Sequence, residues 1–225
     1  MNYLLLFLHK WDHECDRRLK RLVDYIWSSL DLHLMGWVNQ NPSEKPDLHE
    51  FADSNFAGCL ATQRSTTGCF LTIAGVITRF PLNAISKRQT SVGVSTPEVE
   101  WVAAHHALTY ELLPAQEICA YVLREDYVSH FHEDNTAFIR VMKTGRNPAM
   151  RHVGRVHGVD LASMHEKFQP APTGSINIFY EQSALMAADI FTKGYTNVPK
   201  WSAVMALINV YDLAYRTRIR LKYIT

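Results

Sequence analysis

The sequence lacks a strong overall charge and any compositional bias. Its 225 residues carry 23 Lys and Arg against 22 Asp and Glu, a formal net charge of +1. This balance gives no general attraction to nucleic acid or to anionic membranes, so either role would depend on local clusters. Hydrophobic residues make up 47% and charged residues 20%, which excludes a disordered or collagen-like chain.

Paired cysteines and long apolar segments are also missing. The four cysteines (Cys15, Cys59, Cys69 and Cys119) are widely spaced and form no Cys-x-x-Cys pair, which disfavours a zinc ribbon or a thioredoxin-type site. We therefore expect reduced thiols in an intracellular protein. The apolar run at 3–8 is too short for a membrane span or a signal-peptide core, so no membrane partner is expected.

The N-terminal part of the sequence predicts a helix followed by a linker. Residues 13–31 carry apolar side chains at three- and four-residue steps, which is typical of an amphipathic helix. Residues 39–46 (NQNPSEKP) are polar and hold two prolines, as linkers do. We expect three parts: a segment with this linker at 1–46, a domain at 47–195, and a helix with a basic tail at 196–225.

Beyond the linker, short strands and helices alternate. Strands are predicted at residues 48–56, 69–78, 76–86, 127–133 and 175–181. Helices are predicted at residues 97–113, 135–143, 159–168, 184–193 and 198–214. Ser95 and Glu98 have the spacing of a capping box, and Ser183 and Gly194 are placed to cap the ends of one helix. This order predicts an α/β fold with a mixed five-stranded sheet flanked by helices.

Four acidic residues lie where this order would gather them at one edge of the sheet. Asp53 lies inside the first strand and Glu100 in the second turn of the long helix. Asp134 lies between a strand and a helix, and Asp189 has apolar neighbours on both sides. Each of them alone is more often a solvated surface group or a helix cap. Only their joint placement points to a site.

Five ordered blocks resemble the ribonuclease H domain of copia-type LTR retrotransposon polyproteins. They are FADSNFAGCLATQRSTTGCFLTIAG at 51–75, SKRQ at 86–89, STPEVEWVA at 95–103, HEDNTAFI at 132–139 and AADIFTK at 187–193. Residues 15–38 resemble the segment that joins the reverse transcriptase to this domain, whereas no Tyr-x-Asp-Asp polymerase motif is present. The chain is therefore similar to the C-terminal end of such a polyprotein.

The resemblance implies a ribonuclease H-like fold and a metal-dependent endonuclease. The family's catalytic carboxylates correspond to Asp53, Glu100, Asp134 and Asp189. In the family they bind two divalent ions, usually Mg²⁺ with Mn²⁺ as an alternative, and hydrolyse the RNA strand of an RNA–DNA hybrid. Carboxylate oxygens suit these ions, and an ion pair can clamp the attacking and leaving oxygens. Without cations the four carboxylates should bind protons or be locally loose.

A histidine assists product release in many ribonucleases H, and two are candidates here. The match of the blocks does not choose between His157 and His165. A histidine suits the role because it titrates near neutral pH, and His157 is slightly preferred. A zinc site from His152, His157 and His165 is a weaker alternative, since no cysteine supports it. Residues 155–168 depart from the family's run and carry an insertion, which favours a diverged copy. The alternative is therefore a decayed element that binds nucleic acid, or docks to a reverse transcriptase, without cutting.

The expected partners are an RNA–DNA hybrid and the reverse transcriptase domain of the parent polyprotein. Residues 135–159 hold no acidic residue and five basic ones: Arg140, Lys143, Arg146, Arg151 and Arg155. They can contact phosphates, although a solvated basic loop explains them equally well. The hydroxyls of Ser65, Thr66 and Thr67 can donate to a phosphate, and Asn135 is our choice for reading the 2′-hydroxyl.

Overall fold

The computed structural model divides into two compact units. It describes residues 2–41, 43–59, 61–124, 127–145, 156–169 and 175–212. One unit comprises Met1–Met35 with Val210–Thr225, and the other is Gly36–Asn209. The basic tail that we expected after the last helix lies outside the described residues from position 213 onward. None of the helices among the described residues is both long and apolar enough to cross a membrane.

The smaller unit holds the predicted N-terminal helix. Helices α1 (Asn2–Leu6) and α2 (His13–Ser28) precede β1 (Leu32–Leu34), which pairs antiparallel with β7 (Val210–Asp212). The helix α2 ends three residues before the predicted end, because the hydroxyls of Ser28 and Ser29 donate to carbonyls of its last turn. The apolar face of α2 stays open, and the Trp27 side chain is 78% exposed.

The larger unit contains the mixed five-stranded sheet that the sequence predicts. Its strands are β2 (Asp47–Asn55), β3 (Thr66–Ala74), β4 (Arg79–Arg88), β5 (Ser129–Glu133) and β6 (Ile176–Tyr180). Their order is β4-β3-β2-β5-β6. β2 and β3, like β3 and β4, pair antiparallel as hairpins, whereas β2–β5 and β5–β6 pair parallel. The prediction of a mixed five-stranded sheet is therefore confirmed.

The long helix after the sheet's hairpins continues further than predicted. The segments α3 (Thr96–His106), η1 (Ala107–Leu112) and α4 (Leu113–Leu123) follow one another without a break. Pro114 usually ends a helix, since it has no N–H and its ring crowds the carbonyl four residues earlier. Here the segment η1 is a π-helix in which the Leu113 N–H donates to the Leu108 carbonyl, five residues back. The wider turn accommodates the proline, so the predicted end at residue 113 was wrong.

The remaining helices agree with the predictions in place but not always in length. They are α5 (Thr136–Thr144), α7 (Leu161–Lys167), the 3-10 segment η3 (Ala187–Phe191) and α8 (Val198–Leu207). The helix predicted at 184–193 is shorter than expected, and Met186 rather than Ser183 lies at its N-cap. The helix predicted at 198–214 ends at Leu207, because Asn209 adopts a left-handed conformation (φ 60°) and the chain turns into β7.

The polar segment that we expected to be a linker contacts the β3–β4 hairpin. Two residues before this segment, Trp37 forms an isolated antiparallel bridge with Arg79. The carboxylate of Glu44 accepts hydrogen bonds from the backbone N–H groups of Ile77 (2.7 Å) and Thr78 (3.0 Å). This part of the segment is therefore fixed to the turn of the hairpin.

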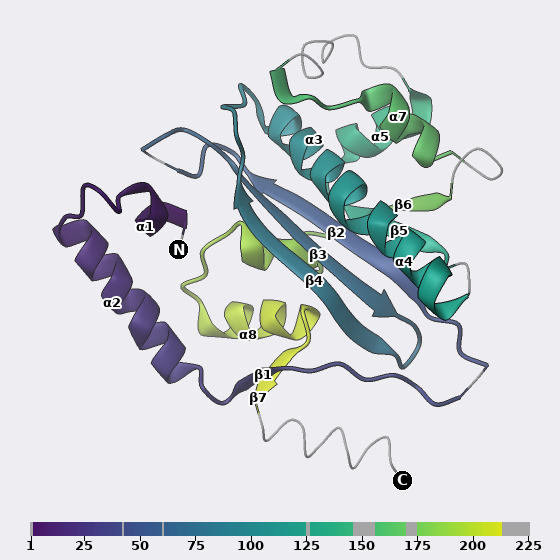
Figure 1. Ribbon diagram of the computed structural model, residues 1–225, viewed down its shortest axis with the longest axis horizontal. Helices are drawn as coiled ribbons and strands as arrows, with labels where there is room; N and C mark the ends of the chain where they lie inside the picture. Colours follow the sequence, from purple (N-terminus) through teal and green to yellow (C-terminus); the bar gives the residue numbers. More distant parts are fainter. Residues whose placement is uncertain are drawn as a thin grey trace. The chain divides into compact units, whose positions relative to one another are not determined.

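The two faces of the sheet have different surroundings. Leu48 and Ala52 of β2 are buried in a core that α3, η1 and α5 complete. Successive residues of a strand point to opposite faces, so His49, Phe51 and Asp53 project from the other face. The segment with η3 contacts β2 and β3 on that side, and α8 follows it (Figure 1). Helices therefore flank the sheet, and the second face carries the polar side chains discussed next.

Candidate metal centre

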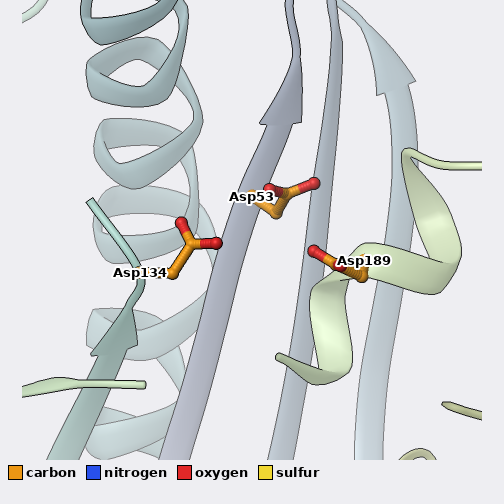
Figure 2. A group of neighbouring side chains, drawn as sticks. All are labelled: Asp53, Asp134 and Asp189. Carbon is orange, nitrogen blue, oxygen red and sulfur yellow. The ribbon is translucent and has the colours of Figure 1, made fainter. Parts of the chain in front are cut away.

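Three of the four predicted carboxylates meet at one end of the sheet. Asp53 belongs to β2, Asp134 follows β5 directly, and Asp189 lies in η3. One carboxylate oxygen from each lies within 4.8 Å of the others, so the group can hold a metal ion. Figure 2 shows the three side chains converging from these separate elements. β2 and β5 are parallel neighbours, so their carboxyl ends lie at the same edge of the sheet.

A glycine on β3 allows η3 to approach this end of the sheet. Gly68 lies directly opposite Asp53 in the β2–β3 register. A Cβ atom at this position would lie 2.6 Å from Thr192 Cγ2 and 2.8 Å from the Ala188 carbonyl oxygen. Only glycine permits this contact without a shift of the backbone. The close approach brings Asp189 beside Asp53.

Glu100 lies beside the aspartates, although it is not part of the group that meets within 4.8 Å. Its Oε2 atom accepts a hydrogen bond from the Ser54 N–H at 3.0 Å. Burial, together with the charges of Asp53 and Asp134, raises the pKa of Glu100 to about 9. The glutamate therefore holds a proton at neutral pH when no cation is bound.

Glu133 is a fifth acidic residue of this region that the sequence analysis missed. Its side chain is fully buried. Burial and the neighbouring Glu100 raise its pKa well above the usual range. One signal was available, since Glu133 and Asp134 are consecutive acids at the end of a predicted strand.

Lys193 and Thr192 contact the aspartates and were also missed. The Lys193 ammonium lies 2.6 Å from Asp189 Oδ1 and 3.3 Å from Asp53 Oδ1. The Thr192 hydroxyl donates to Asp53 Oδ2. Burial raises the pKa of Asp53 to about 6, while Lys193 and Thr192 act in the opposite direction. Both residues belong to the AADIFTK block, which could have indicated them.

His157 contacts Ser91 and Glu98, and not the carboxylates of the candidate metal centre, in the contacts that the structure describes. Its Nδ1 lies 2.7 Å from Ser91 Oγ, and its Nε2 lies 2.6 Å from Glu98 Oε1. The side chain is 1% exposed. Glu98 also accepts from the Val94 N–H, one residue before the N-cap Ser95. The Ser95 side chain makes no capping hydrogen bond, so the capping box predicted from the spacing of Ser95 and Glu98 is not formed. His165 lies with its Nδ1 2.6 Å from the Met142 carbonyl oxygen, and His152 lies outside the described residues.

The residues predicted to contact the substrate differ in their exposure to solvent. Arg140 and Lys143 are exposed on α5, just after Asp134. The oxygen of the Asn135 side chain caps that helix by accepting from the N–H groups of its first turn. Ser65 is fully buried, and its hydroxyl accepts from the Ala57 N–H, so it is not accessible to a phosphate. Thr66 is half-buried at the start of β3. The other predicted basic contacts, Arg146, Arg151 and Arg155, lie outside the described residues.

A group of histidines lies on the same face of the sheet. His49 and His130 are near the start of β2 and β5, and His132 is two residues before Asp134. The Nδ1 of His49 lies 2.9 Å from the Nε2 of His132, whose Nδ1 lies 3.0 Å from a Glu181 oxygen. His130 Nε2 lies 3.1 Å from Asp47 Oδ2. Burial, together with the neighbouring histidines, lowers the pKa of His49 and His132 to about 4. The sequence analysis did not predict this histidine group.

No family model matches the chain. Nor does any solved structure match it at a significant level. A proposal about its function therefore depends on the geometry described above and on the motif resemblance.

Proposed function

We propose that the protein is a ribonuclease H-type endonuclease, which hydrolyses the RNA strand of RNA–DNA hybrids with two divalent metal ions. The observation that carries this proposal is the meeting of Asp53, Asp134 and Asp189 from three distant segments, with Glu100 beside them. These are the four positions that the resemblance to the copia-type ribonuclease H domain selects. The mixed five-stranded sheet is consistent with that fold.

The donor set of the site fits Mg²⁺ or Mn²⁺. All of its side-chain ligands are carboxylate oxygens, which these ions prefer. Burial, together with the neighbouring carboxylates, raises the pKa values of Asp53 and Glu100, and a bound cation would favour their charged forms. Asp53 and Asp134 would hold one ion with help from Glu100, and Asp189 would complete the second position with Asp53. When bound, the two ions supply an activated water and stabilise charge on the phosphate.

The chain's own groups orient the carboxylates. The Ser54 N–H holds Glu100, and the Thr192 hydroxyl holds Asp53. The Ser183 hydroxyl donates to Asp134 Oδ2 at 2.9 Å. Such hydrogen bonds fix the direction of a ligand oxygen and favour its charged form. Cleavage would leave a 5′-phosphate and a 3′-hydroxyl, as the family resemblance implies.

The exposed basic residues of α5 would bind the hybrid. Arg140 and Lys143 lie on the helix that begins directly after Asp134, so phosphates held by them would lie near the carboxylates. Phosphate contacts of this kind supply affinity without sequence preference.

Asp134→Asn tests the proposal. The variant should lose Mg²⁺-dependent cleavage of a labelled RNA–DNA hybrid, because it removes one ligand charge from the site. Its circular dichroism and its unfolding midpoint should stay close to those of the wild type, since Asp134 is only half-buried. The matched control is Glu117→Gln, an exposed acid on α4. Full cleavage by the Asp134→Asn variant would contradict the assignment.

A second candidate is a decayed copy that binds hybrids or docks to a reverse transcriptase without cutting. The divergent residues 155–168 and the open apolar face of α2 favour it. In the same assay, a wild-type protein that retains the hybrid in a gel shift but does not cleave it with Mg²⁺ or Mn²⁺ would support this candidate.

A further inference from the structure

Lys193 is bound to two of the carboxylates that would hold metal. It lies four residues after Asp189, one turn further along the chain. Its ammonium makes ion pairs with Asp189 Oδ1 at 2.6 Å and with Asp53 Oδ1 at 3.3 Å. Among the ion pairs found in the described residues, these two are the ones that reach the aspartate group.

The environments of the three side chains differ. The carboxylates of Asp53 and Asp189 are 2% and 7% exposed, whereas the Lys193 side chain is 41% exposed. Two buried carboxylates this close to each other repel unless a cation lies between them. The lysine supplies that cation, and its long flexible stem lets the ammonium leave towards water without a change in the backbone.

An ammonium and a divalent ion cannot use these oxygens at the same time. Mg²⁺ requires oxygen ligands at about 2.0–2.1 Å. An ammonium hydrogen-bonded to the same Asp189 oxygen would then lie within a few ångströms of the ion, where like charges repel strongly. A metal ion can therefore occupy the Asp53–Asp189 side only after Lys193 has moved away.

We propose that Lys193 is an exchangeable counter-cation that determines the affinity of the second metal position. In the metal-free protein it neutralises Asp53 and Asp189 and keeps them together. A divalent ion at this position must displace it, so this ion binds more weakly than the ion held by Asp53 and Asp134. The inference deepens the proposed function, because it rests on metal binding by this site, but it does not require cleavage.

A titration of the metal-free full-length chain with MnCl₂, followed by calorimetry and by electron paramagnetic resonance, tests the inference. The wild type should bind one ion tightly and one weakly. Lys193→Met keeps the length of the side chain and removes its charge, and it should tighten the weak ion by roughly tenfold. Lys193→Arg keeps the charge and should bind the weak ion no more tightly than the wild type does. Unchanged or weaker binding of both ions in the Lys193→Met protein would overturn the inference.

Lys200→Met is the matched control. The charge of Lys200 also acts on Asp189, but its ammonium lies over the Tyr195 ring instead, 5.6 Å from the ring centroid. Removing a nearby charge without a direct contact should change the affinity by no more than about twofold. An effect as large as that of Lys193→Met would mean that general charge, not displacement, sets the affinity, and would overturn the inference.

Thermal unfolding separates displacement from a merely structural role. Lys193→Met should lower the unfolding midpoint of the metal-free protein and leave that of the Mn²⁺-saturated protein unchanged, because the ions then replace the ammonium. An equal loss in both forms would contradict the inference. If Lys193→Met does not fold, the same two measurements on Lys193→Gln decide the question.

The outcomes also separate this inference from the proposed function. If neither the wild type nor the Lys193 variants bind Mn²⁺ at millimolar concentration, both the metal-dependent function and the inference fail. If Mn²⁺ binds and Asp134→Asn weakens it while Lys193→Met has no effect, the inference alone fails.

Discussion

Two groups of titratable side chains lie along β2 and β5, one of carboxylates and one of histidines, and burial shifts their pKa values in opposite directions. At the carboxyl ends of β2 and β5, burial raises the pKa of Asp53 to about 6 and that of Glu100 to about 9. Along the same strands, burial lowers the pKa of His49 and His132 to about 4. In both groups the neutral form is favoured, since burial disfavours charge.

The difference between the two groups lies in their counter-charges and in their packing. The acidic group has three aspartates and the partly exposed Lys193, so it keeps an excess of negative charge. The histidine group packs as an aromatic layer, in which the rings of Phe51 and His132 stack with centroids 4.2 Å apart. Side chains that stack as neutral rings stabilise the sheet. The comparison indicates that the acidic group is arranged to receive cations, whereas His49 and His132 are arranged to remain uncharged.

Acidification should destabilise the packing of the histidine group and have the largest effect on the free energy of unfolding. His49 and His132 have pKa values below the ordinary 6.5 in the folded protein, so their contribution to stability is present above pH 6.5 and is lost as the pH falls towards 4. We expect the pair to contribute a loss of about 3 kcal/mol between pH 7 and pH 4. This loss is the difference in unfolding free energy between the wild type and the double variant described below, because the raised pKa values of Glu50 and Glu100 act in the opposite direction over the same range. Urea unfolding at pH 7, 5 and 4 measures it.

The double variant His49→Gln, His132→Gln is the control for this prediction. Glutamine keeps hydrogen-bonding groups at both positions and does not titrate in this range. On going from pH 7 to pH 4, its unfolding free energy should therefore fall less, or rise more, than that of the wild type. The same slope in both proteins would show that other groups cause the loss.

Glu50, on the opposite face of β2, tests whether burial alone disfavours a charged side chain. It is fully buried, and neither of its carboxyl oxygens has a hydrogen-bond partner among the described residues. Burial raises its pKa well above the usual range, so it destabilises the fold increasingly as the pH rises above 4.5. Glu50→Met should stabilise the protein by about 2 kcal/mol at pH 8, and less at pH 5. A gain that does not depend on pH in urea unfolding would contradict this explanation.

Metal binding should remove a proton from the acidic group, and this would distinguish it from the histidine group. The raised pKa of Glu100 means that it is protonated at pH 7.5 in the metal-free protein. Binding of Mn²⁺ should then release about one proton. Calorimetric titrations in two buffers with different ionisation enthalpies measure this release, and Glu100→Gln should reduce it. Equal binding enthalpies in both buffers for the wild type would contradict the assignment of this proton.

The sequence predicted the parts of the site that depend on local pattern. The strands and the four acids could be predicted, because alternation and turn residues locate strand ends and the motif blocks locate Asp53, Glu100, Asp134 and Asp189. The histidine group could not, since it depends on the parallel register that brings His49 opposite His130. A register between distant strands is set by the packing of the whole sheet and not by either strand alone.

The end of the long helix and the contacts of His157 and Lys193 could not be predicted from local sequence patterns. Pro114 favours a helix end, but the π-helical segment η1 lets the helix continue. His157 was slightly preferred over His165 although the motif blocks do not choose between them, and the residues that it contacts, Ser91 and Glu98, lie 66 and 59 residues away. The AADIFTK block could have indicated Lys193 as a residue of the site, but its contacts with Asp53 and Asp189 depend on the close approach of η3 to Gly68, which the block does not reveal.

The hydrogen bond that orients Asp134 should give the smallest effect. Ser183 was predicted to cap a helix, but its hydroxyl donates to Asp134 Oδ2 at 2.9 Å and leaves the other oxygen for an ion. Both groups are near the surface, so this hydrogen bond contributes only about 0.5 kcal/mol. Ser183→Ala should therefore weaken Mn²⁺ binding by about twofold to threefold in a calorimetric titration. Ser163→Ala, an exposed serine on α7, is the control and should have no effect. Tighter binding in the Ser183→Ala protein would mean that the hydroxyl competes with the ion for Asp134 instead of orienting it.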